Sequence, residues 1–147
     1  VTGAAGIQGI GFAIAKKFLE SGAKVFLCDL KEQELEKARE QLAPLGEVKA
    51  YVMDVSRADS VEKVFERAEQ ELGSIDVFVN NAGIYPQSMI CDMGEELWET
   101  VMNVNLKFRF CVFLIPSAYA FYFCFQGKSG FCTQSFPPLI SINVPVR

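Results

Sequence analysis

A glycine-rich segment opens the sequence and has the composition of a phosphate-binding turn. It reads VTGAAGIQGIG over residues 1–11, with glycines at Gly3, Gly6, Gly9 and Gly11. Glycines let a backbone turn sharply and approach a pyrophosphate, and the N-terminus of a following helix offers free N–H groups and a positive dipole end. The predicted contact residues are Gly3, Gly9, Ile10 and Gly11. The alternative is a flexible loop without a function.

Acidic and amide side chains close the next three apolar runs. Asp29 ends KVFLCD, Asp54 ends VKAYVMD, and NNAG begins where IDVFVN ends. A carboxylate at a strand end can accept hydrogen bonds from both ribose hydroxyls of an adenosine, and ligands of parallel sheets bind at the carboxyl ends of the strands. The predicted contact residues at these ends are Asp29, Leu30, Asp54, Val55, Asn81, Ala82 and Gly83. The alternatives are turn chemistry, which Asn, Asp and Gly favour, or helix capping by the first acid.

Strand and helix patterns alternate along the first part of the chain. The runs at 24–29, 48–54 and 75–80 are typical of strands buried on both faces. Helical faces are predicted for four groups: Ile10, Ile14 and Phe18; Leu35, Ala38 and Leu42; Val61, Val64, Phe65, Ala68 and Leu72; and Leu97, Val101 and Val104. Asp59 with Glu62 predicts a capping box, Gly73 a helix stop, and Asp92 with Glu95 the start of the last helix. Helices between strands indicate an α/β fold with a parallel sheet.

Composition narrows the function classes. The net charge is −4, from 14 Lys and Arg against 18 Asp and Glu, which argues against a nucleic-acid partner. Histidine is absent, so the commonest general base and metal ligand are missing. The five cysteines are odd in number and form no CxxC pair, so we expect no metal site and no disulfide framework. Reduced thiols predict a cytoplasmic protein.

In combination, these motifs resemble the short-chain dehydrogenase/reductase family. They read VTGAAGIQGIG, Asp29, Asp54-Val55, Asn80-Asn81-Ala82-Gly83 and Asn103-Val104-Asn105-Leu106, and they span residues 1 to about 107. The resemblance implies a Rossmann-type doubly wound parallel sheet, incomplete here because the first strand and the C-terminal half are missing. It also implies a nicotinamide cofactor and hydride transfer to or from a small-molecule alcohol or carbonyl. Asn105 matches the Asn of the family's Asn-Ser-Tyr-Lys tetrad and is the predicted catalytic residue; the alternative is a polar residue on an exposed helix face.

Two departures from the family pattern bear on the cofactor and on catalysis. Five residues separate Gly3 from Gly9, where three are usual in the family. Because Asp29 is present and no Lys or Arg surrounds the glycine motif, the resemblance favours NAD over NADP. The family's base is the Tyr of a YxxxK motif, and none of the four tyrosines here has Lys four positions later. We therefore expect the chain to be inactive alone; the alternative function is a catalytically dead dinucleotide-binding module.

The composition changes near Lys107, and we divide the chain into residues 1–107, 108–129 and 130–147. All 18 acidic residues precede that point, whereas eight of the 13 Phe follow it. Residues 108–129 resemble nothing in the family and have the composition of translated non-coding sequence, whereas GFCTQ at 130–134 resembles the family's continuation. A membrane span is the rival interpretation, but 16 uncharged residues fall short of the roughly 20 required, and a buried hydrophobic helix or hairpin is the third. The insertion interrupts the helix through which relatives form homo-oligomers, which argues against the same assembly here.

Overall fold

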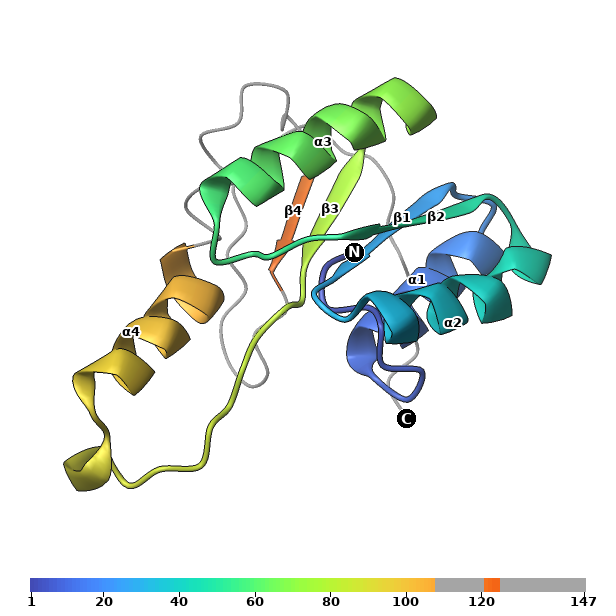
Figure 1. Ribbon diagram of the computed structural model, residues 1–147. Coiled ribbons are helices and arrows are strands. Elements are labelled where there is room, and N and C mark those ends of the chain that lie inside the picture. Colours follow the sequence, from blue (N-terminus) through green and yellow to red (C-terminus); the bar gives the residue numbers. More distant parts are fainter. Residues whose placement is uncertain (108–120, 125–147) are drawn as a thin grey trace.

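The computed structural model describes residues 1–107 and the backbone of residues 121–124. Our expectations for residues 108–120 and 125–147 therefore lie outside the described residues. The described part is an α/β arrangement of parallel strands and flanking helices (Figure 1), as the alternating sequence pattern predicts.

Parallel strand pairing organises the sheet. Strand β1 (Val25–Asp29) pairs with β2 (Val48–Val52), and β3 (Val77–Asn80) pairs with β4 (Phe121–Cys124). The first two residues lie between these pairs. The amide of Cys28 donates to the carbonyl oxygen of Val1 at 2.9 Å, and the amide of Thr2 donates to that of Val79 at 3.1 Å. The spatial order is therefore β2, β1, residues 1–2, β3 and β4.

The described part contains four α-helices. They are α1 (Ile10–Glu20), α2 (Glu32–Leu42), α3 (Ala58–Leu72) and α4 (Glu95–Met102), the last continued by a π-helical turn over Asn103–Lys107. Short 3-10 turns occupy Ala43–Leu45 and Ile90–Asp92. Helices α1 and α2 lie on one side of β1 and β2, and α3 lies across the other side (Figure 1).

The core accordingly forms two clusters, one on each face of β1. Leu27 packs with Leu19 of α1 and Leu35 of α2, whereas Cys28 packs with Val61 and Phe65 of α3. Adjacent strand residues point to opposite faces, so a strand covered by helices on both sides must be apolar throughout. This requirement explains the continuously apolar core of β1. Strands β2 and β3 also form where they are predicted, but β2 contains the half-buried Lys49 and β3 begins with the exposed Val77.

The predicted face of α1 is wrong by one position. The helix buries Gly11, Ala15 and Leu19, whereas Ile10 is 60% exposed and Ile14 is only half-buried. Small side chains on the inner face let the helix approach the glycine loop closely, because there is no bulky group to hold the two backbones apart. In the first two turns the large aliphatic residues therefore do not mark the buried face, and only Leu19 in the last turn does.

Two predicted helix starts also differ from the structure. Helix α3 begins at Ala58, and Asp59 forms an ion pair with Arg57 at 2.9 Å where the sequence predicts a capping box. No side chain of the described residues caps α3, but the Ser60 hydroxyl oxygen accepts a hydrogen bond from the amide of Asp54 at 3.0 Å and so links the first turn to the segment after β2. Helix α4 begins at Glu95 after Gly94, so Asp92 belongs to the preceding 3-10 turn. The predicted helix stop is confirmed: Gly73 has φ of 87° directly after α3.

Strand β4 falls inside the segment that sequence composition sets apart. Its backbone pairs with β3 in parallel, with Val77 opposite Phe121 and Asn80 opposite Cys124. The segment that we set apart as an insertion therefore contributes these four residues to the parallel sheet. The division of the chain at Lys107 stays a prediction for the rest of the segment.

Candidate dinucleotide-binding site

The glycine loop is held in place by contacts that only glycine permits. Gly3 has φ of +65°, a conformation that L side chains rarely adopt, and a Cβ there would lie 2.9 Å from Cα of Ala82. At Gly11, a Cβ would lie 2.5 Å from the carbonyl oxygen of Gly3 and 2.7 Å from Nδ2 of Asn81. The first turn of α1 therefore packs directly on the loop backbone and on the residues that follow β3.

Hydrogen bonds join the start of the chain to the NNAG segment. The hydroxyl of Thr2 accepts from the amides of Asn81 and Ala82, each at 3.0 Å, and donates to the carbonyl oxygen of Val79 at 3.2 Å. Nδ2 of Asn81 donates to the carbonyl oxygens of Thr2 at 2.9 Å and Gly3 at 3.0 Å. Two predicted motifs separated by almost eighty residues thus form one network at the carboxyl edge of the sheet.

The two additional residues of the glycine motif are accommodated in a tight turn. The amide of Gly9 donates to the carbonyl oxygen of Gly6 at 2.7 Å, so Ile7 and Gln8 project from the loop. A Cβ on Gly9 would lie 2.9 Å from the same oxygen, which explains the glycine at the start of α1. The turn leaves the packing of Gly3 and Gly11 intact, so the extension does not disrupt the helix N-terminus.

Asp29 connects the end of β1 to the glycine loop. Its Oδ2 accepts a hydrogen bond from the amide of Ala5 at 3.0 Å, and its Oδ1 accepts one from the amide of Lys31 at 3.2 Å. An ionised carboxylate offers about four acceptor positions, so acceptor capacity remains for a ligand hydroxyl. Leu30, the predicted neighbour contact, is 64% exposed beside it.

Asp54 and Val55 have local roles at the end of β2. The Asp54 carboxylate accepts hydrogen bonds from the amide and the hydroxyl of Ser56, at 2.9 and 2.6 Å. Val55 is half-buried and packs against the cluster beneath α3. These contacts match the turn chemistry that the sequence leaves open, and a cofactor contact at either residue stays a prediction.

Asn105 is paired with the backbone of Ile84 beyond NNAG. Its Nδ2 donates to the carbonyl oxygen of Ile84 and its Oδ1 accepts from the amide of the same residue, both at 2.9 Å. A Cβ on Gly83 would lie 3.4 Å from Oδ1 of Asn105 and 3.8 Å from the hydroxyl of Tyr85. Asn105 is therefore half-buried and engaged, and does not lie on a free helix face. Its side chain fixes the direction of the chain where NNAG leaves the sheet.

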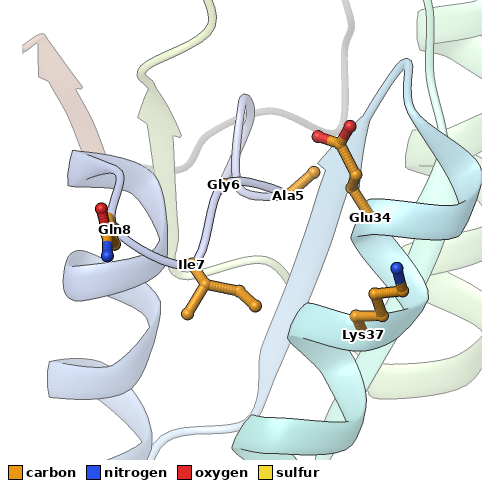
Figure 2. A pocket seen from close by; sticks show the side chains of 6 residues that line it. All are labelled: Ala5, Gly6, Ile7, Gln8, Glu34 and Lys37. Atoms are coloured by element: carbon orange, nitrogen blue, oxygen red, sulfur yellow. The ribbon is translucent and has the colours of Figure 1, made fainter.

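A hollow of about 500 Å³ lies between the glycine loop and α2 (Figure 2). Its lining residues are Ala5, Gly6, Ile7, Gln8, Glu34 and Lys37. Sequence reasoning missed the two helix residues, because an outward-facing Glu or Lys on an amphipathic helix is ordinary. The sequence analysis also places no Lys or Arg around the glycine motif. The structure corrects this interpretation, because Lys37 is distant in sequence but lines the same hollow.

Two buried groups complete the description of the strand ends. The thiol of Cys28 has its pKa raised to about 11 by burial. Asn80 is only 4% exposed, and its Oδ1 accepts no hydrogen bond from the residues that the structure describes. Within those residues no group of three or more His, Cys, Asp and Glu is placed to hold a metal, and no helix is long and apolar enough to cross a membrane.

Comparisons with known proteins agree with this geometry. The model of the short chain dehydrogenase family matches residues 1–120. The chain is 42% identical over 104 residues to 3beta-hydroxysteroid dehydrogenase 2 of Eggerthella lenta, covering 69% of this chain and 40% of that protein. It is 41% identical over 108 residues to a 3-oxoacyl-(acyl-carrier-protein) reductase of Thermotoga maritima, covering 73% of this chain and 43% of that protein.

Solved structures show the same relationship. A short chain dehydrogenase from Mycobacterium smegmatis superposes with a TM-score of 0.72 at 40% identity, over 76% of this chain and 47% of the other. A short-chain dehydrogenase/reductase from Brucella melitensis superposes with a TM-score of 0.71 at 35% identity, over 76% and 46% of the two chains. The chain thus spans less than half the length of these relatives. By its motifs, its parallel sheet and these matches, it belongs to the short chain dehydrogenase family.

Proposed function

We propose that this chain is the dinucleotide-binding part of an oxidoreductase that transfers hydride between a nicotinamide cofactor and a small alcohol or carbonyl substrate. One observation carries the proposal: the glycine loop, Asp29 and the NNAG segment meet at the carboxyl edge of the sheet. Members of the family bind nicotinamide cofactors, and dinucleotides bind parallel sheets at this edge.

The residues at this edge suit the chemistry of a dinucleotide. The N-terminus of α1 follows Gly9 and offers a pyrophosphate free N–H groups at the positive end of the helix dipole. Asp29 retains acceptor capacity for ribose hydroxyls. The cofactor supplies the hydride acceptor or donor, and these residues bind and orient its adenosine and pyrophosphate portions.

We infer a preference for NAD(H) over NADP(H) from the position of Asp29. Two unit charges about 4 Å apart repel by roughly 4 kcal/mol at an effective dielectric of about 20, and solvent screening lowers that value at an open site. A discrimination of about ten- to several hundredfold follows if the net repulsion is about 1.4 to 3.5 kcal/mol. Fluorescence titrations of NADH and NADPH on the 147-residue chain test this preference.

The variant Asp29→Asn is the matched test, since it keeps the side-chain shape and removes the charge. It should narrow the ratio between the two affinities, whereas Asp76→Asn on an exposed residue before β3 should leave the ratio unchanged. Equal or tighter binding of NADPH to the unaltered chain would overturn the preference. Failure of both cofactors to bind would overturn the proposed function itself.

We further propose that Asn105 acts at the reacting end of the site and that these 147 residues do not complete it. The chain contains no Tyr followed by Lys four positions later, so a proton donor of the family's kind is absent from the printed sequence. We therefore expect cofactor binding without turnover for any alcohol or ketone. NADH formation that persists through purification and depends on the chain would contradict this expectation.

The same observation favours a second candidate, a dinucleotide-binding module without catalysis. The coding sequence around and beyond residue 107 discriminates the two. An in-frame YxxxK downstream favours the oxidoreductase, whereas a continuous coding sequence that ends at Arg147 favours the binding module. For either candidate, the free thiols of Cys28 and Cys91 support a reducing, cytoplasmic setting.

A further inference from the structure

We propose that Lys37 is a specificity residue at the adenosine end of the site, where its ammonium group binds a 2′-phosphate and limits the preference for NAD that Asp29 imposes. This inference rests on the proposed dinucleotide-binding function. It assigns to an α2 residue a role that the glycine motif and the strand ends do not indicate.

Lys37 shares the hollow beside the glycine loop with Ala5, the loop residue that is hydrogen-bonded to Asp29. Ala5 lines the hollow, and its amide donates to Oδ2 of Asp29 at 3.0 Å. Lys37 lines the same hollow from α2, opposite the loop residues (Figure 2). In the proposed complex, a ribose bound by the Asp29 carboxylate directs its 2′ position toward the hollow that Lys37 lines.

The charges around the hollow leave Lys37 available to an anion. Nζ of Lys31 lies 3.3 Å from Oε2 of Glu34, so the acid that lines the hollow already has a cationic partner. Within the residues that the structure describes, Lys37 forms no ion pair. An uncompensated ammonium group beside a ribose site is the arrangement that accommodates an additional phosphate.

The two-residue extension of the loop forms one wall of this hollow. Ile7 and Gln8 stand in the turn that the Gly9 amide closes onto the carbonyl oxygen of Gly6, and both line the hollow with Lys37. Without Ile7 and Gln8, three residues would separate Gly3 from Gly9, which is the spacing usual in the family. The contribution of Lys37 should therefore depend on the extension.

Binding of two nucleotide probes to the full 147-residue chain tests the inference. Adenosine 2′,5′-bisphosphate carries the 2′-phosphate and adenosine 5′-monophosphate does not, and calorimetry gives both dissociation constants. Because Lys37 is exposed, Lys37→Gln should weaken binding of the bisphosphate by only about two- to fivefold, as expected for an exposed ion pair. Binding of the monophosphate should not change.

Two further variants make the outcome specific. Lys16→Gln removes an equal charge from an exposed residue of α1 that does not line the hollow, and should leave both constants unchanged. In a chain that lacks Ile7 and Gln8, Lys37→Gln should lose its effect on the bisphosphate.

Three results would overturn the inference. In the first, Lys37→Gln changes the dissociation constants of both probes equally, or changes neither constant. If the monophosphate still binds in that case, the proposed function is not affected. In the second, Lys16→Gln weakens binding of the bisphosphate as much as Lys37→Gln does, which would show that the effect comes from the net charge of the chain. In the third, neither probe binds the unaltered chain, which overturns the proposed function as well.

Discussion

The side-chain amide of Asn81 occupies the space that a side chain at Gly11 would need. Nδ2 of Asn81 lies 2.7 Å from the position of a Cβ on Gly11, and it donates hydrogen bonds to the carbonyl oxygens of Thr2 and Gly3. The beginning of α1, the glycine loop and the segment after β3 therefore fix one another. A substitution in one of these three segments should therefore disturb the packing and hydrogen bonds of the other two.

Gly11→Ala should destabilise the chain because its methyl group meets backbone and amide atoms that cannot move independently. The nearest is the carbonyl oxygen of Gly3, at 2.5 Å. Overpacking of this kind costs about 1–3 kcal/mol, which urea unfolding measures. Gly6→Ala is the control, since a Cβ there has its nearest neighbours at 3.9 and 4.0 Å. Equal losses of stability in the two variants would show that the loop relaxes around Gly11.

Thr2→Val should also destabilise the chain, although Val and Thr have nearly the same shape. Thr2 is fully buried, and its hydroxyl accepts hydrogen bonds from the amides of Asn81 and Ala82. Loss of the acceptor leaves the Ala82 amide unsatisfied, which costs about 1–3 kcal/mol, and this amide should exchange hydrogen faster in the variant. The Asn81 amide keeps a second acceptor, the carbonyl oxygen of Val79 at 3.1 Å, so its exchange should change less. Thr2→Ser keeps the hydroxyl and should preserve the slow exchange of the two amides. Unchanged exchange in Thr2→Val would contradict the network.

Sequence patterns predict the strands and the residues at their ends better than they predict contacts between distant segments. Apolar runs that end at a polar residue locate β1, β2 and β3 correctly, although β2 is only partly buried. The predicted face of α1 is wrong because large aliphatic residues outweigh Gly11 and Ala15 in a hydrophobic pattern, whereas close backbone packing selects small ones. The capping interpretation fails at α3 because the helix begins at Ala58, so Asp59 lies within the first turn, where it pairs with Arg57.

The candidate site shows the same contrast. The sequence identifies Asn81 as a site residue, but the hydrogen bonds that it donates to Thr2 and Gly3 depend on the order of the strands. Sequence motifs do not identify Lys37, because it lies beside the hollow at the glycine loop only when α2 packs against β1. Local patterns contain no information on which outward-facing side chain borders a distant loop.

Asn105→Leu should loosen the chain after NNAG without unfolding the sheet. The Asn105 side chain both donates to and accepts from the backbone of Ile84, and leucine of similar size can do neither. We expect faster hydrogen exchange of the Ile84 amide and unchanged exchange of the β1 amides. Asn103→Leu, in the same π-helical turn, is the control. Unaltered protection of Ile84 in Asn105→Leu would exclude a positioning role for Asn105.

The two described free cysteines should differ sharply in reactivity, because one lies in the core and the other on the surface. Burial raises the pKa of Cys28 to about 11, whereas Cys91 is exposed. A thiol reacts as its thiolate, and a raised pKa means that the thiolate forms only at higher pH; at pH 8 about one part in a thousand of Cys28 is ionised. Iodoacetamide at pH 8, followed by peptide mapping, should therefore label Cys91 and spare Cys28. In urea the pKa of Cys28 should return toward its ordinary value, and labelling should follow. Rapid labelling of Cys28 in the folded chain would show that the core between β1 and α3 opens on the time scale of the reaction.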